Sequence, residues 1–104
     1  MIQIEFHHNF VKSYDKRIKQ NVKLSTQVEE RVNLFKSNPK NKVLKNHLLT
    51  GNKHGYRSFS ITGDIRIIYY LQSEDLAIFV DIGSHNQVLT STLTTSQKSQ
   101  LMGN

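Results

Sequence analysis

The sequence predicts an α+β domain in which an N-terminal strand precedes two antiparallel helices packed on one face of a small antiparallel β-sheet, in the order β-α-α-β-β-β. Three observations carry this prediction: apolar–polar alternation at the start, two successive apolar stripes with helical spacing, and three strand-like runs separated by short turns. A chain of 104 residues has room for one hydrophobic core. We assign residues 1–89 to a single domain and residues 90–104 to a C-terminal tail or short helix.

The first strand and the first helix follow directly from the spacing of apolar residues. Residues 2–6 alternate between apolar and polar side chains, which is the period of a half-buried strand. Phe10, Tyr14 and Ile18 then fall four residues apart, as the apolar stripe of a helix requires. The other positions of this helix hold Lys12, Lys16, Arg17 and Lys19. Such a set is typical of a solvated helix face, with ribosomal RNA binding as the alternative.

The second helix has a predicted start and a predicted end. Thr26 and Glu29 have the spacing of a capping box, so we expect the helix to begin near Ser25-Thr26. Its apolar stripe extends from Val28 to Phe35, and Pro39 ends it.

The remainder of the domain is predicted to be a sheet. A polar, basic connection covers residues 40–55, and three strand-like runs follow at residues 56–61, 65–71 and 76–82. Because the turns between the runs are short, consecutive strands should pair antiparallel. Tyr69 and Tyr70 point to opposite faces of their strand, one into the core and one outward.

Positive charge is concentrated in the first part of the chain. Residues 1–58 carry 12 basic and 4 acidic side chains, which is +8, and residues 59–104 carry 2 and 4, which is −2; together they give the +6 of the whole chain. A basic region suits a polyanion such as RNA, because each cation that meets a phosphate releases a counterion. A solvated basic surface without a partner is the alternative.

Several classes of protein are excluded or disfavoured. The chain has no cysteine, so it has neither a disulfide framework nor a thiolate site. No apolar run approaches the ~20 residues of a membrane span, and the N-terminus lacks the pattern of a signal peptide. We therefore expect a soluble, cytoplasmic protein that contacts no membrane.

No common metal or nucleotide motif is present. His7 and His8 are adjacent, so on a strand they would point to opposite faces and chelate one ion poorly. Gly51, Gly55 and Gly63 lack the spacing of a phosphate-binding loop. We expect neither a metal ion nor a cofactor.

Five short motifs occur in sequence order after residue 46. They are His47-Leu48-Leu49-Thr50-Gly51, Gly55-Tyr56-Arg57, Asp64, Arg66-Ile67-Ile68-Tyr69 and Ile82-Gly83-Ser84-His85. Their order and spacing, after a helix pair that ends in Asn38-Pro39, resemble the RelE/ParE toxin superfamily and, within it, the YafQ-like and RelE/StbE-like branches. The resemblance covers residues 1–89 and implies a RelE-like fold.

The resemblance also implies a function, namely ribosome-dependent cleavage of mRNA without a metal, by a toxin whose partner is an acidic antitoxin. The nucleophile is the 2′-OH of the RNA, so the protein must supply a base, an acid and cations for the phosphate. Histidine suits proton transfer near neutral pH, and arginine suits the phosphate. The catalytic candidates are His85, His47, Asp64 and Arg66. The candidates for binding mRNA or ribosomal RNA are Arg57, Lys45, Lys53, His54, Lys42 and Ser60.

Two positions depart from the YafQ-like pattern. That branch places working residues at positions that match His47, Ser60, Asp64, His85 and Leu89. It usually has a histidine where this chain has Ser60 and an aromatic residue where it has Leu89. Serine is no unassisted acid or base at neutral pH, and leucine stacks poorly on a base.

Local geometry leaves some roles open. If the turn at residues 62–64 is tight, Arg57 and Arg66 are expected to project from the same face of the sheet. Asp64 either orients a catalytic base or bonds to the backbone of its own turn, and we favour the turn.

Two alternatives to a nuclease share the same fold. One is a ParE-like gyrase inhibitor without enzymatic activity, which the late Gly83-Ser84-His85 disfavours because ParE-like chains generally lack that histidine. The other is a decayed toxin that binds antitoxin or RNA without cleavage, which the residues at positions 60 and 89 keep open.

Overall fold

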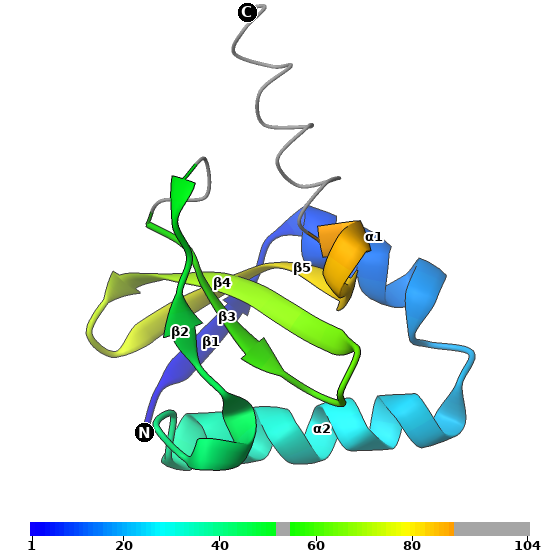
Figure 1. Cartoon of the computed structure of the whole chain (residues 1–104), viewed down its shortest axis with the longest axis horizontal. Helices are drawn as coiled ribbons and strands as arrows, with labels where there is room; N and C mark the ends of the chain where they lie inside the picture. The colour runs from blue at the N-terminus through cyan, green and yellow to red at the C-terminus, as the bar shows by residue number, and fades with distance from the viewer. Residues whose placement is uncertain (52–54, 89–104) are drawn as a thin grey trace, which may run out of the picture.

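A computed structural model describes residues 1–51 and 55–88 of the chain. Its elements follow the predicted order, with one short strand added (Figure 1). They are β1 (Gln3–Phe6), α1 (His8–Arg17), α2 (Val22–Ser37), the 3-10 turn η1 (Lys42–Leu44), β2 (His47–Leu48), β3 (Arg57–Ser60), β4 (Ile65–Ser73) and β5 (Leu76–Ser84). The predicted α+β class is therefore confirmed. The proposed tail from residue 90 onward lies outside the described residues.

The strands form one five-stranded sheet in the order β1-β5-β4-β3-β2. The pairs between β2, β3, β4 and β5 are antiparallel, as the short turns predict. β1 pairs with β5 in parallel. A parallel pair needs a long connection, and here both helices and the other three strands lie between β1 and β5 in the sequence. The short β2 lies within the segment predicted as a connection and forms the edge of the sheet.

Side-chain caps determine where the helices begin. The Nδ1 of His7 accepts a hydrogen bond from the backbone N–H of Asn9 at the start of α1. The side chain of Asn21 accepts from the N–H of Leu24 at 3.0 Å, so α2 begins at Val22. The predicted start near Thr26 is therefore wrong, because an asparagine cap occurs earlier in the chain. The predicted end of this helix before Pro39 is confirmed.

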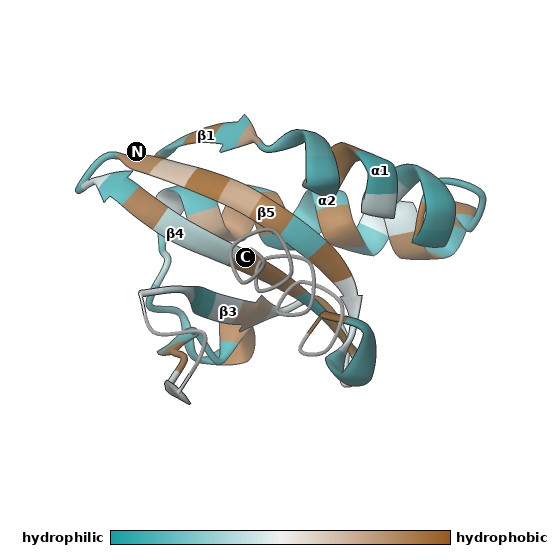
Figure 2. Cartoon of the chain, turned by 90° about the horizontal axis from the view of Figure 1, so that it is seen from above, coloured by the Kyte–Doolittle hydropathy of each residue, from teal (hydrophilic) through white to brown (hydrophobic). Residues whose placement is uncertain are grey.

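Both helices pack on one face of the sheet, which we call the helix face. Its centre is the fully buried ring of Phe35 from α2. This ring lies 4.6 Å from that of Phe59, 4.9 Å from that of Tyr69 and 5.7 Å from that of Phe79, between ring centroids. Figure 2 shows the hydrophilic outer surface of α1 above the apolar stretch of β5. No helix in the described part of the chain is long and apolar enough to cross a membrane.

The opposite side of the sheet, which we call the far face, has its own small apolar cluster. Ile68, Ile78, Val80 and Val88 are buried there. Val88 belongs to the helical turn of residues 85–88, so this turn folds onto the far face directly after β5. The alternation of the two tyrosines is as predicted: Tyr69 lies in the core and Tyr70 lies partly exposed on the far face.

Candidate functional site

Strand pairing brings several of the predicted site residues onto the far face. In one row across the sheet, His47 on β2 is opposite Ser58 on β3, which is opposite Ile68 on β4. In a second row, Ser60 is opposite Arg66. Residues paired in this way point to the same side of a sheet. Because Ile68 belongs to the far-face cluster, both rows lie on the far face, about 7 Å apart along the strands.

Arg57 does not join these residues. It pairs with Tyr69, whereas Arg66 pairs with Ser60; Arg57 is three positions before Ser60, and an odd offset along a strand points to the opposite face. The expectation that both arginines share one face is therefore wrong. Arg57 lies on the helix face, where its Nε donates to the Oδ1 of Asn46 at 3.2 Å.

The same Asn46 oxygen also accepts a hydrogen bond from the Tyr69 hydroxyl at 2.9 Å. Burial raises the pKa of Tyr69, and the hydrogen bond to Asn46 and the nearby charge of Arg57 offset part of that rise. Arg57 therefore helps to satisfy a buried polar cluster at the edge of the core.

Arg66 carries a donor on the far face that the described residues leave unsatisfied. Its Nε atom is buried and has no hydrogen-bond partner among the described residues. The hydroxyl of Ser58, one row away on the neighbouring strand, is buried and equally without a partner. A buried donor without a partner costs stability, so such groups are expected where a ligand supplies the missing acceptor. Their common face is thus suited to an anion.

His47 is held by the backbone of the basic segment before it. Its Nδ1 lies 2.9 Å from the carbonyl oxygen of Lys45. A carbonyl only accepts, so this bond places the proton on Nδ1 and leaves Nε2 with its lone pair in the neutral ring. Lys45 adopts a left-handed backbone (φ 49°) at the end of η1, and its exposed side chain and that of Lys42 lie close to His47 in sequence.

His85 lies at the other side of the far face, in the turn that follows β5. Gly83 of β5 pairs with Arg66, so this turn begins beside the Arg66 row. The N–H of Ser84 donates to Oε1 of Gln87 at 2.8 Å, and the N–H of Gln87 donates to Oγ of Ser84 at 3.2 Å. This reciprocal bonding is a capping box, and it fixes the turn that presents the exposed His85.

Asp64 is exposed in the turn between β3 and β4, beyond the Ser60–Arg66 pair. The hydroxyl of Thr62, not the carboxylate of Asp64, stabilises this turn: it accepts from the N–H groups of Asp64 and Ile65 at 3.1 and 3.0 Å. The favoured role for Asp64 in bonding its own turn is therefore wrong. Lys53, His54 and Leu89 lie outside the described residues.

A buried polar cluster beside β5 escaped the sequence analysis. The Oδ1 atom of Asp81 accepts from the Ser13 hydroxyl at 2.6 Å and pairs with Nη1 of Arg17 at 3.4 Å. Arg17, assigned above to a solvated helix face, is thus part of the buried structure. The signal that pointed to the cluster is a single acidic residue, Asp81, within an otherwise apolar strand.

No metal centre accompanies these groups in the described ranges 1–51 and 55–88, where no three histidine, cysteine or acidic side chains gather to hold an ion.

The chain matches a known protein family over most of its length. Residues 2–90 fit the model described as the bacterial toxin of type II toxin-antitoxin system, YafQ. The chain belongs to the YafQ toxin family. It is accordingly a toxin of the type II toxin–antitoxin class, and the resemblance inferred from its motifs is confirmed. Comparison with curated protein sequences gives no match.

Solved structures of related toxins share the fold. The crystal structure of YafQ from E. coli strain BL21(DE3) is similar with a TM-score of 0.71 and 24% identity, over 85% of this chain and 98% of that chain. The E. coli DinJ–YafQ toxin–antitoxin complex gives 0.69 and 25%, over 84% and 96%. A YoeB/ParE toxin from Agrobacterium tumefaciens gives 0.68 and 18%, over 81% and 99%. The expected RelE-like fold is confirmed by these similarities.

Proposed function

We propose that this YafQ-family toxin is a metal-independent endoribonuclease that cuts mRNA on the ribosome. The observation that carries the proposal is Arg66, whose buried Nε has no partner among the described residues and lies on the face that also bears His47 and Ser58. A guanidinium binds phosphate through a planar fork of donors. His47 lies on that face on β2, and His85 begins the turn whose Val88 folds onto the same face after β5.

The reaction needs only groups that these residues can supply. The 2′-oxygen of the RNA attacks the adjacent phosphorus, the O2′–P bond forms and the P–O5′ bond breaks. A base takes the proton of the 2′-OH, and an acid gives a proton to the leaving 5′-oxygen. We assign the base to Nε2 of His47, because its Nδ1 is bound to the Lys45 carbonyl, and the acid to His85. Arg66 stabilises the charge on the phosphorane oxygens.

We propose an acidic antitoxin as the partner of this chain. The DinJ–YafQ and YoeB–YefM toxin–antitoxin structures are among the structural neighbours. Residues 1–58 of this chain carry 12 basic and 4 acidic side chains, a net +8 that an acidic protein complements. The exposed Lys42 and Lys45 beside His47 are proposed to bind the phosphates of mRNA or ribosomal RNA when the antitoxin is absent.

One observation supports a second candidate, a toxin that binds without cutting. Ser60 is buried on the far face opposite Arg66, at the position where the YafQ-like pattern usually has histidine. If that histidine were required, the site would bind phosphate but transfer protons poorly.

Primer extension on a defined mRNA in a reconstituted translation reaction tests the proposal. We expect cleavage only in the presence of ribosomes, and at the same rate for toxin treated with EDTA. The His85→Ala variant should cleave about 10²-fold more slowly or worse. Lys23→Met, which removes an exposed charge at the start of α2, is the control. Intact mRNA at toxin levels that saturate the ribosomes would favour the non-cutting binder.

A further inference from the structure

We infer that a polar stripe on α1 positions the His85 turn, so that Arg17 and Asp81 act as positioning residues for the far-face site. The stripe consists of Asn9, Ser13 and Arg17, which lie four residues apart and therefore on one side of the helix. The predicted effect on cleavage rests on the nuclease function proposed above, whereas the predicted effect on the order of the turn does not.

The stripe lies along the edge of β5 beyond Phe79, where none of the described strands pairs with it. Strand β1 pairs with β5 only as far as Phe79. Beyond that point the side chain of Asn9 donates to the carbonyl of Val80 at 3.0 Å, and Nη1 of Arg17 donates to the carbonyl of Ile82 at 2.9 Å. Side chains of α1 thus take over the edge bonds that a longer β1 would have made.

A bulge turns Asp81 toward this stripe. The register of β4 and β5 shifts so that Ile68 is opposite Asp81 but Tyr69 is opposite Phe79. The carboxylate of Asp81 is 1% exposed, and its Oδ1 accepts from the Ser13 hydroxyl, the N–H of Ile82 and Nη1 of Arg17. A buried carboxylate requires such compensation, and losing one partner leaves the charge uncompensated.

Gly83 lies between Arg17 and the turn that holds His85. A Cβ on Gly83 would lie 2.7 Å from Nη1 of Arg17 and 2.7 Å from Oε1 of Gln87. The guanidinium and the capping glutamine therefore both lie against the backbone of Gly83. Gln87 in turn bonds reciprocally with Ser84, which immediately precedes His85. A continuous set of contacts thus leads from α1 to the turn that holds His85.

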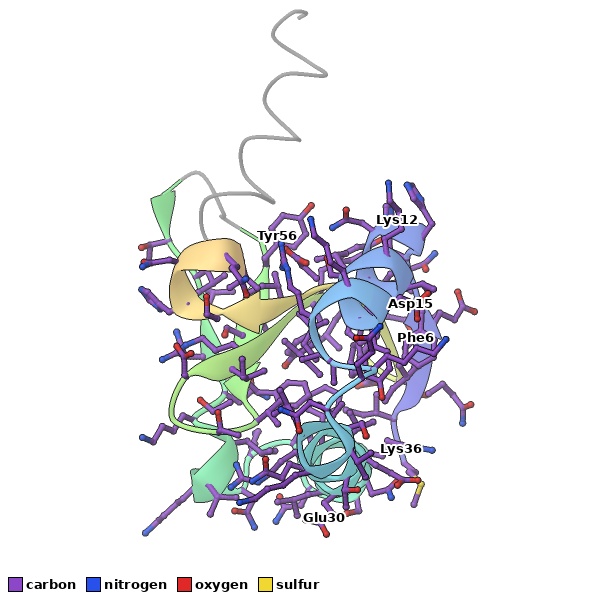
Figure 3. The ribbon with its side chains drawn as sticks, turned by 90° about the vertical axis from the view of Figure 1, so that its right-hand side faces the viewer. Phe6, Lys12, Asp15, Glu30, Lys36 and Tyr56 are labelled. Atoms are coloured by element: carbon purple, nitrogen blue, oxygen red, sulfur yellow. The ribbon has the colours of Figure 1, made fainter. Side chains whose placement is uncertain are left out.

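The end of β5 separates α1 from the turn that follows this strand in Figure 2, so the link between them passes through Gly83 and the side chains of Arg17 and Gln87. Figure 3 shows the labelled Lys12 and Asp15 on the outward side of α1. Loss of the anchor should therefore loosen the turn and misplace His85 while leaving α2 and the aromatic core intact. A displacement on the order of 1 Å at a catalytic group lowers turnover strongly.

The test uses the full chain with Arg17→Met, which removes the donors, and Arg17→Lys, which keeps the charge. Lys16→Met removes the exposed neighbouring charge and is the matched control. We measure amide hydrogen exchange by NMR and, on ribosomes, kcat and KM for cleavage. In Arg17→Met the amides of Ser84 and Gln87 should exchange at least about tenfold faster, with α2 amides changed by less than about threefold.

Cleavage by Arg17→Met should show a kcat lower by about 10- to 100-fold and a KM within about threefold of wild type, with partial recovery in Arg17→Lys. Unchanged exchange at Ser84 and Gln87, or equal acceleration at every amide, overturns the inference. If the wild-type chain does not cut RNA, the proposed function fails, but the exchange measurement still decides whether Arg17 positions the turn. Asp81→Asn, which keeps the shape of the side chain, provides a second break of the anchor.

Discussion

The helix face and the far face of the sheet differ in how completely their polar groups are satisfied. On the helix face, buried polar groups are bonded: the Tyr69 hydroxyl and the Arg57 Nε share Asn46, and Asp81 accepts from Ser13 and Arg17. The far face carries the two buried side-chain atoms of the described residues that have no partner, Oγ of Ser58 and Nε of Arg66. The first arrangement stabilises a fold, whereas the second leaves donors for a ligand. Substitutions on the two faces should therefore affect different measurements.

The largest effect on stability is expected from Phe35→Ala. Phe35 is fully buried and its ring contacts those of Phe59, Tyr69 and Phe79. We expect the free energy of unfolding to fall by about 3–5 kcal/mol, from lost burial and the cavity left behind. Urea unfolding measures it, with Val22→Ala at a 77% exposed position as the control. A loss no greater than that of the control would show that the aromatic cluster does not stabilise the domain.

Arg66→Met should separate activity from stability. Cleavage should fall by about 10²-fold, because the phosphorane loses its cation. The free energy of unfolding should stay unchanged or rise by up to about 1 kcal/mol, since an unsatisfied buried donor is removed. Arg31→Met is the matched control: Arg31 donates to the carbonyls of Val43 and Ser60, and its loss should cost about 1 kcal/mol. If both variants are destabilised equally, Arg66 stabilises the fold as Arg31 does, and the proposed difference between the two faces is wrong.

Tyr69→Phe tests the polar cluster at the edge of the helix face. At about pH 8 the variant should lose about 1 kcal/mol of unfolding free energy with the hydrogen bond to Asn46. Burial raises the pKa of Tyr69 in the folded chain above the ordinary value of 10.0, so the folded state holds the proton more tightly than the unfolded state. The stabilisation is complete below pH 10.0 and declines as the pH rises through the raised folded value.

Chemical denaturation at about pH 8 and about pH 11 measures this dependence. The wild-type chain should lose more stability than Tyr69→Phe over that interval, because phenylalanine has no proton to release. Parallel losses in the two proteins would mean that the hydroxyl of Tyr69 titrates alike in the folded and unfolded chains.

Local patterns predicted the strands well because each pattern depends only on neighbouring residues. The alternation of residues 65–71 corresponds to β4, and it correctly opposes Tyr69 and Tyr70. The start of α2 was misplaced because two capping signals compete, and Asn21 lies earlier than Thr26. The parallel placement of β1 depends on contacts across the whole chain, which spacing alone does not encode.

The site was harder to predict because it depends on register and on long-range pairing. Whether Arg57 shares a face with Arg66 is decided by the pairing of β3 with β4, and one residue of register reverses the answer. Arg17 resembles its solvated neighbours until Asp81, which is 64 residues away in the sequence, is placed beside it. The motifs nevertheless named His47, Ser60 and Arg66 as candidate site residues, and the strand pairing places these three on one face.

The smallest expected effect, Ser60→His, asks whether the far face lacks a proton-transfer group. Ser60 is buried opposite Arg66, so an imidazole at this position would lie beside the guanidinium on the far face. Imidazole exchanges protons near neutral pH and serine does not, so cleavage should increase by up to about tenfold. Ser60→Asn supplies a polar side chain without a titrating group and should leave the rate near that of wild type. Equal rates in the two variants would mean that His47 and His85 already suffice for both proton transfers, and that the serine at position 60 is compatible with a fully active toxin.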